Sequence, residues 1–199
     1  MHKRDDLAIL ILAGGKATRC PKKLERACGE FPMIVRTYRN LRGRYPVYIS
    51  INRPFSMAVA AQLPAVMVVD RRANRGPLSG IVSTMQRMKA SRIFVVAGDM
   101  PRVDLALVEE LLARWQLGDE AVVALDSSGT PQPLLAVYDR RAFLRASHAF
   151  EDDRAVKDVL AGLRRREVAL TRPDQMLNVN TEDDFRTAKR DLALASVPA

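Results

Sequence analysis

The sequence predicts an α/β protein with a mostly parallel central sheet and helices on both faces. The first apolar run, Leu7–Leu12, ends directly in Ala-Gly-Gly, a pattern typical of a strand buried on both sides. Later apolar runs alternate with segments of helical spacing, as crossover connections between parallel strands require. Hydrophobic residues make up 48% of the chain and aromatic residues only 6%, so we expect an aliphatic core.

The predicted elements follow one another along the chain. After the first strand we expect a helix over residues 33–41, which begins after Pro32. Strands are expected at 46–51, 65–69 and 93–97, with an amphipathic helix at 78–88 between the last two. The next expected element is a helix that is capped by Asp104 and runs to about Trp115. Two strands are then expected at 121–125 and 134–138, around a turn at 127–131. The rest of the chain is expected to form helices near 139–148 and 154–162, a strand at 167–170 and a last helix from about Thr181.

Length and composition favour one soluble domain. The 199 residues contain no repeat, linker or low-complexity stretch, so we expect a single domain over 1–199 with a core of about 7–190. The start of the chain has no secretory signal pattern, and no apolar run approaches the roughly 20 residues of a membrane span. Cys20 and Cys28 match no metal-binding spacing. We therefore expect a cytoplasmic protein without a membrane partner.

The charge balance favours anionic ligands. The chain has 32 Lys and Arg against 23 Asp and Glu, a formal charge of +9, which attracts anions through its summed field. No basic run is interleaved with aromatic residues for stacking on nucleic acid. Phosphorylated small molecules are thus favoured over nucleic acid, although most single arginines are also explained as solvated helix surface.

The loop after the first strand has the composition of a polyphosphate site. Gly14 and Gly15 allow the backbone to approach a ligand and expose its N–H groups, and four cations follow within eight residues: Lys16, Arg19, Lys22 and Lys23. The alternative is a glycine turn with solvated lysines. The spacing matches neither a dinucleotide-binding glycine motif nor a P-loop.

Other candidate residues also follow predicted strands, where open parallel sheets bind ligands. Asp99 ends the fourth strand at Gly98-Asp-Met-Pro101, and we expect it to bind Mg²⁺, which takes one or two protein carboxylates beside phosphate oxygens; a simple turn is the alternative. Asp70 ends the third strand, where it is a candidate contact for base, ribose or metal. Pro77 suits the first turn of a helix, and the free N–H groups of that turn could bind a phosphate or carboxylate.

Near the end of the chain, Asn178 and Asn180 occupy alternate positions. In an extended strand they would point the same way and form a binding edge, with a structural role as the alternative. Thr181 can cap the final helix, with Asp184 three residues on in a capping box. Neither His2 nor His148 belongs to a nucleophile motif, so hydrolysis by a triad is not expected.

Five motifs in order resemble the molybdenum cofactor guanylyltransferase family. They are Leu12-Ala-Gly-Gly, Gly76-Pro-Leu-Ser-Gly80, Gly98-Asp-Met-Pro101, Gln132-Pro-Leu-Leu-Ala136 and Asn178-Val-Asn-Thr181, and the match spans roughly residues 7–190. The resemblance implies a three-layer, Rossmann-like nucleotidyltransferase fold. It also implies Mg²⁺-dependent transfer of GMP from GTP to Mo-molybdopterin with release of pyrophosphate, and contact with proteins that deliver or receive the cofactor.

The resemblance also implies roles for individual residues. Leu12, Ala13 and Gly14, with Gly15 beside them, match backbone contacts to GTP, Asn52 and Asp70 match nucleotide contacts, and Asp99 matches the magnesium ligand. Arg19 with Lys22 or Lys23 would stabilise the leaving pyrophosphate. Asn178 and Asn180 lie where the family is thought to bind the pterin, and Gly76, Gly80 and Gln132 are assigned to the same substrate.

Two departures from the family pattern stand out. The family loop usually continues Arg-Met-Gly-Gly-x-x-Lys, whereas Arg19 is followed here by Cys-Pro-Lys-Lys, so the loop is shorter. Counting back from Gly29 favours Lys22 as the phosphate-binding lysine, with Lys23 as the alternative. The second strand ends Ser50-Ile-Asn-Arg53 where the family often has Asn-x-Asn, which removes one expected contact to the base.

There are two alternative functions. The chain could be a transferase that uses CTP or ATP with another phosphorylated acceptor, or a non-catalytic relative that binds GTP.

Overall fold

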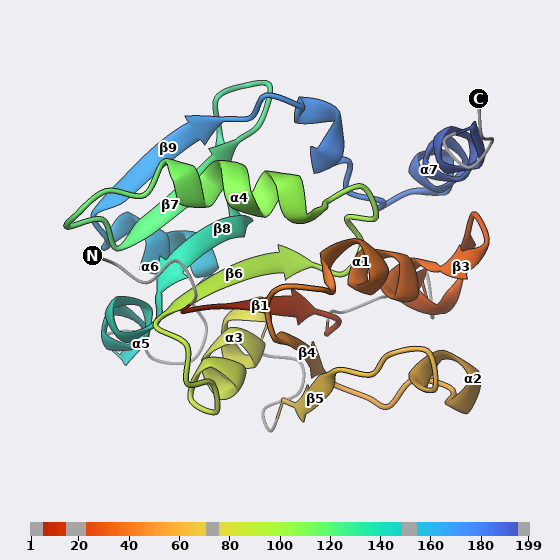
Figure 1. Ribbon diagram of the computed structural model, residues 1–199, viewed down its shortest axis with the longest axis horizontal. Helices are drawn as coiled ribbons and strands as arrows, with labels where there is room; N and C mark the ends of the chain where they lie inside the picture. The colour runs from red at the N-terminus through yellow and green to blue at the C-terminus, as the bar shows by residue number, and fades with distance from the viewer. Residues whose placement is uncertain (1–5, 15–22, 71–75, 149–154, 195–199) are drawn as a thin grey trace.

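The fold is built on one seven-stranded sheet (Figure 1). The computed structural model describes residues 6–14, 23–70, 76–148 and 155–194. Four parallel strands form one half of the sheet, and the antiparallel strand β8 joins them to the other half. Their spatial order is β5 (Val66–Val69), β4 (Val47–Ile51), β1 (Leu7–Leu12), β6 (Arg92–Ala97), β8 (Pro131–Asp139), β7 (Ala121–Leu125) and β9 (Arg165–Ala169).

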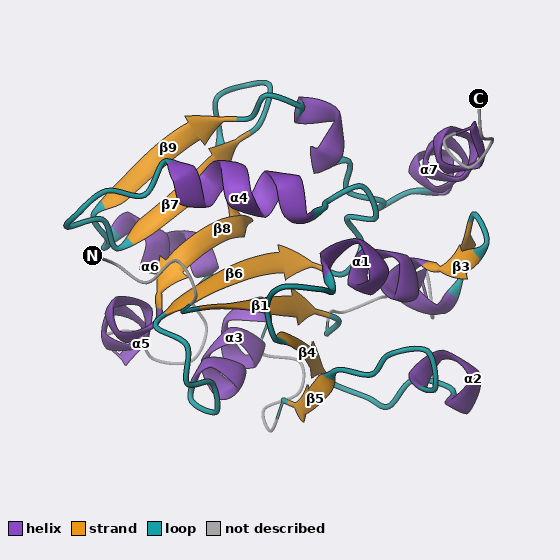
Figure 2. Cartoon of the chain, in the orientation of Figure 1, coloured by secondary structure: helices purple, strands orange, loops and turns teal. Residues whose placement is uncertain are grey.

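Helices cover both faces of the sheet and give three layers (Figure 2). The helices α1 (Met33–Leu41), α2 (Met57–Ala60) and α4 (Leu105–Ala113) pack on one face, and α3 (Pro77–Met85), α5 (Arg140–His148) and α6 (Val156–Ala161) pack on the other. Strand β1 lies between them: Leu7, Ile9 and Ile11 face the first group, and Ala8, Leu10 and Leu12 face the second. The apolar run Leu7–Leu12 is therefore buried on both faces, which confirms the predicted fold class.

The long predicted elements are present, and their ends differ by a few residues. Helix α3 ends at Met85 rather than at 88 because the chain tightens there: the N–H of Met88 bonds to the carbonyl of Met85, an i→i+3 turn. Met88 is still buried, so the apolar spacing continues past the helix. Helix α4 ends at Ala113 in the same way, since the N–H of Trp115 bonds to Leu112.

Several short elements have no counterpart among the predictions. They are the 3₁₀ turns η1 (Lys23–Glu25) and η2 (Pro173–Met176), helix α2 and the hairpin of β2 (Ala27–Cys28) with β3 (Phe31–Pro32). Each is too short to show a period. The hairpin turns through Gly29, whose φ of 74° favours glycine.

The last helix, α7 (Glu182–Leu194), packs against this hairpin and α1. Cys28, Met33, Val179, Phe185 and Ala188 form a small buried cluster between them. Burial raises the pKa of the Cys28 thiol, so this cysteine serves as a neutral apolar side chain. The cluster attaches the end of the described chain to the segment that follows the first loop.

Helix α7 begins with the predicted capping box. The Thr181 hydroxyl accepts the N–H of Asp184 at 3.1 Å, and the Asp184 carboxylate accepts the N–H groups of Thr181 at 2.8 Å and Asn180 at 2.9 Å. These N–H groups lower the pKa of the Asp184 carboxyl below its ordinary value. The cap therefore also fixes the backbone at Asn180.

We expect Asp184→Asn to destabilise the protein at pH 7 by about 1 kcal/mol, the usual cost of losing a helix cap. Because the folded-state pKa is lowered, the stabilisation is present above the ordinary pKa of about 3.9 and is lost as pH falls through the lowered value. Urea unfolding at pH 7 and at pH 3 measures both effects. Asp183→Asn is the matched control, because Asp183 is exposed and pairs only with exposed Arg186 among the described residues. An equal loss in both variants, or a difference unchanged by pH, would contradict the cap.

Candidate active site

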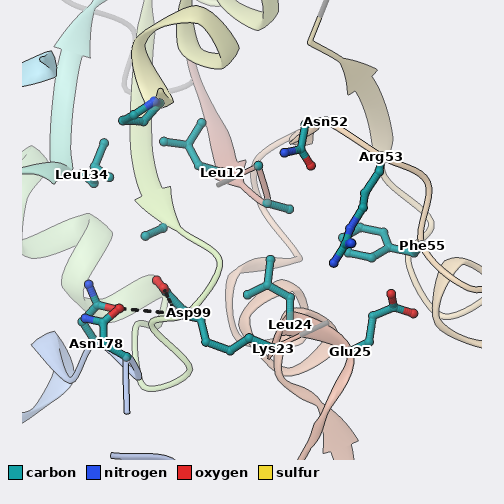
Figure 3. A pocket seen from close by; sticks show the side chains of 15 residues that line it. Leu12, Lys23, Leu24, Glu25, Asn52, Arg53, Phe55, Asp99, Leu134 and Asn178 are labelled. Carbon is teal, nitrogen blue, oxygen red and sulfur yellow. Dashed lines mark hydrogen bonds and ion pairs between the residues drawn. The ribbon is translucent and has the colours of Figure 1, made fainter. Parts of the chain in front are cut away.

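A cleft of about 330 Å³ opens at the carboxyl ends of β1, β4 and β6 (Figure 3). It receives side chains and backbone from the loops after these strands, from η1 and from the segment before α7. Its lining consists of Leu12, Ala13, Gly14, Lys23, Leu24, Glu25, Asn52, Arg53, Phe55, Pro77, Ala97, Asp99, Leu134, Asn178 and Asn180. The volume is in the range of small-molecule sites.

An ion pair between Lys23 and Asp99 forms the charged end of the cleft. The Lys23 Nζ lies 2.6 Å from Asp99 Oδ2 and donates a second hydrogen bond to Asn180 Oδ1 at 3.3 Å. The side chains of Lys23 and Asp99 are 17% and 18% exposed, so water only partly screens the pair. Figure 3 shows the two side chains extended toward one another, with Asn178 beside them. Residues far apart in sequence thus meet at one end of the site.

Gly98 allows Asp99 to reach this position. A Cβ atom at Gly98 would lie 3.0 Å from Ile34 Cδ1 and 3.1 Å from the carbonyl oxygen of Leu12. The backbone at Gly98 is held there, because its N–H donates to Leu12 and its carbonyl accepts from the Thr37 hydroxyl. The end of β6 therefore lies against β1 and α1, and the next residue, Asp99, lines the cleft.

One oxygen of the Asp99 carboxylate lacks a partner in the described part of the chain. Its Oδ1 is buried and has no hydrogen-bond partner among the described residues, which is costly for a carboxylate oxygen unless a ligand completes it. No cluster of three or more His, Cys, Asp or Glu side chains exists in the part of the chain that the structure describes. A single carboxylate with an oxygen left unpartnered by the described residues suits Mg²⁺, which uses few protein carboxylates and takes its other ligands from phosphates and water.

Most sequence-predicted residues that the structure describes line this cleft. Leu12, Ala13, Gly14, Asn52 and Asp99 lie along the predicted nucleotide side, and Lys23, Asn178 and Asn180 lie beside Asp99. The two asparagines are not in a strand. The N–H of Val179 bonds to the carbonyl of Asp99 at 3.0 Å, and buried Val179 leaves both flanking asparagines at the cleft.

Four predicted residues lie outside the cleft lining. Asp70 accepts the Ser79 hydroxyl at 2.7 Å, and Gln132 donates to Asp126 at 2.7 Å within the β7–β8 hairpin. Gly76 precedes α3 with a φ of 78°, and a Cβ at Gly80 would lie 2.6 Å from Ser50 Oγ. These contacts explain the four residues structurally, and their ligand roles stay predictions. Gly15, Arg19 and Lys22 lie outside the described residues.

The cleft also contains residues that the sequence reasoning missed. Glu25, Arg53 and Phe55 lie across the cleft from Asp99, with Leu12 and Leu24 between (Figure 3). The Glu25 carboxylate accepts the N–H of Ser56 at 3.0 Å, which joins η1 to the loop after β4. Arg53 follows Asn52 directly and Phe55 lies two residues further on, so both belong to the loop in which Asn52 was predicted to bind the nucleotide. Nothing in the sequence around Glu25 indicates its place.

No helix in the described ranges combines the length and apolar character of a membrane span.

The chain is similar to proteins of one family across most of its length. The model of the MobA-like NTP transferase domain matches residues 9–168. A probable molybdenum cofactor guanylyltransferase from Chloroflexus aggregans is 30% identical over 154 residues, which cover 68% of this chain and 69% of that protein. A protein of the same name from Bacillus cereus is 27% identical over 195 residues, 92% of this chain and 96% of that protein.

A solved structure supports the fold. The molybdopterin-guanine dinucleotide biosynthesis protein A from Archaeoglobus fulgidus superposes with a TM-score of 0.77 at 20% identity, over 94% of this chain and 99% of that one. At this level of identity the similarity shows the fold alone, and this fold is the nucleotidyltransferase fold that the motifs led us to expect. The family match covers the strands and loops that build most of the cleft, and the chain belongs to the MobA-like NTP transferase family.

Proposed function

We propose that this nucleotidyltransferase transfers GMP from GTP to the phosphate of Mo-molybdopterin and releases pyrophosphate. The observation that carries the proposal is the meeting of Lys23 and Asp99 at 2.6 Å, at the end of a cleft that begins with the Leu12–Gly14 backbone. The names of the similar proteins from Chloroflexus and Bacillus supply the base and the acceptor.

The proposed reaction is an in-line displacement at phosphorus. An oxygen of the acceptor phosphate forms a bond to the α-phosphorus of GTP, and the bond from that phosphorus to the α–β bridging oxygen breaks. The electron pair leaves with pyrophosphate. Because a phosphate monoester is ionised at neutral pH, no side chain has to remove a proton. Positioning and charge neutralisation then provide most of the rate enhancement.

The residues of the cleft have distinct roles in this proposal. Asp99 would hold Mg²⁺, which, when bound, neutralises charge on the triphosphate. Lys23 stabilises negative charge that moves onto the leaving pyrophosphate. Asn178 and Asn180, beside Asp99, provide amide groups for the acceptor. Arg19 and Lys22 are proposed as further cations of the same loop.

We expect Asp99→Asn to lower GMP transfer by at least about 100-fold, in the range found when one transition-state contact is removed. The variant keeps the size of the side chain, so it should fold, as circular dichroism will show. Asp183→Asn, which removes the same charge on the surface, should keep its activity. Near-normal magnesium-dependent transfer by Asp99→Asn would disprove the metal assignment.

Single replacement of Lys22 and Lys23 by alanine tests the phosphate-binding lysine. We expect Lys23→Ala to cause the larger loss of transfer, since the Lys23 amine lies in the cleft beside Asp99. Initial rates with saturating acceptor give the comparison. If neither single variant nor the double variant loses activity, neither lysine serves the phosphates.

A panel of GTP, CTP and ATP in a pyrophosphate-release assay tests the nucleotide. With Mo-molybdopterin as acceptor we expect release from GTP to exceed that from the other two by at least about 10-fold, a difference of about 1.4 kcal/mol in transition-state binding. Preference for CTP or ATP would assign the chain to a related transferase. Binding of GTP without release with any phosphorylated acceptor would show a non-catalytic relative.

A further inference from the structure

The Lys23 ammonium is bound to Asp99 Oδ2, one of the two oxygens that Asp99 could offer to a metal ion. A nitrogen 2.6 Å from this oxygen uses one of its two acceptor positions, and a Mg²⁺ ion at about 2.0–2.1 Å from the same oxygen would be repelled by the ammonium. The ammonium is also held from another side, since it donates to Asn180 Oδ1 at 3.3 Å. The lysine is therefore held beside this oxygen by two partners.

The second oxygen of the carboxylate is poorly accessible to a hydrated ion. Asp99 Oδ1 is buried, and the Asp99 side chain is 18% exposed in total. Mg²⁺ keeps several waters when it binds a protein and gives them up reluctantly. While Lys23 remains in place, a hydrated ion would meet the ammonium at Oδ2 and would have to lose water to reach Oδ1.

The charges at this end of the cleft lead to the same conclusion. Asp99 and Glu25 are the acidic residues of the lining, and Glu25 lies on the far side of the cleft, at Ser56. One carboxylate would have to balance both an ammonium and a divalent ion, and like charges repel strongly where water is scarce. A lone metal ion gains too little there to displace the lysine.

A triphosphate removes this obstacle, because it brings enough negative charge for both cations. We infer that Lys23 stays paired with Asp99 in the free protein and so keeps a divalent cation off this carboxylate. When the nucleotide binds, Lys23 transfers to its phosphates, and Asp99 then accepts the cation. The inference rests on the proposed function in one respect, which is that the nucleotide is GTP. It assigns Lys23 a second role: it keeps the metal site closed in the free protein and opens it when the nucleotide binds.

The experiment is a titration with Mn²⁺ followed by electron paramagnetic resonance, which reports binding without turnover. In the free wild-type protein we expect no Mn²⁺ binding beyond that of Asp99→Asn. In Lys23→Met we expect affinity for Mn²⁺ to rise at least about 10-fold, and the double variant with Asp99→Asn should lose the gain. Lys23→Arg keeps the cation and should remain closed. Lys157→Met, which removes a lysine from the exposed side of α6, is the matched control and should bind as the wild type does.

Addition of a non-hydrolysable GTP analogue completes the test. We expect Mn²⁺ binding to wild-type protein to exceed the sum of binding to protein alone and to analogue alone, and Asp99→Asn to remove the excess. Tight Mn²⁺ binding to free wild-type protein that depends on Asp99 would overturn the inference, as would a folded Lys23→Met variant without higher affinity. A protein that shows these Mn²⁺ responses but fails to transfer GMP would instead refute the proposed function alone.

Discussion

The close approach of the chain at Gly98 to β1 and α1 determines the geometry of the cleft. Only a residue without a side chain fits between Ile34 and the carbonyl of Leu12 without displacing them. Parallel pairing brings β6 level with β1, so that Ala97 lies opposite Leu12. Beyond this pair of residues the two strands diverge: β1 leads into the glycine loop, and β6 leads to Asp99. The distance between the backbone of the first loop and the carboxylate is thus set by a backbone contact rather than by a flexible side chain.

The second constraint is the return of the chain from β9 to the same edge of the sheet. Val179 is buried and bonds to the backbone of Asp99, and α7 then packs on the β2–β3 hairpin. Arg26 lies between the two segments: its two terminal guanidinium nitrogens are each 2.7 Å from a Glu182 carboxylate oxygen, and its Cζ is 4.1 Å from the centroid of the Phe185 ring. The Arg26–Glu182 pair is solvent-exposed and contributes little by itself, whereas Val179 and Phe185 are buried. Their common effect is to hold Asn180 within reach of Lys23.

The sequence predicted the strands and long helices well, because each has a clear physical signal. Leu7–Leu12 is apolar throughout and has neighbours on both faces, and Asp104 caps α4 by accepting the N–H of Leu107 as its position suggested. Asp99 could be placed because a carboxylate at the end of a central strand must lie at the ligand edge. Helix ends were less accurate, since Met88 and Trp115 continue the apolar spacing through turns that are no longer helical.

Other parts of the site could not be derived from local pattern. Lys23 lines the cleft because of how η1 is oriented, and a turn of three residues shows no period in the sequence. Glu25 lines the cleft because of a tertiary bond to the Ser56 backbone, which leaves no trace in the sequence near either residue. Conversely, the contacts of Asp70 and Gln132 arise from α3 and from the β7–β8 hairpin, where short-range hydrogen bonds satisfy both side chains.

The charge of the cleft differs from that of the whole chain, and the difference has a physical meaning. The chain carries a formal charge of +9, which raises the local concentration of anions at long range and is weakened by salt. Within the cleft Lys23 and Asp99 neutralise one another at 2.6 Å. Attraction of an anionic substrate therefore comes from charges other than this pair, whereas the proposed transfer of Lys23 to the phosphates requires the pair to break. Under that proposal, a ligand with too little negative charge to replace Asp99 as the partner of Lys23 leaves the pair intact, and the pair favours polyphosphates.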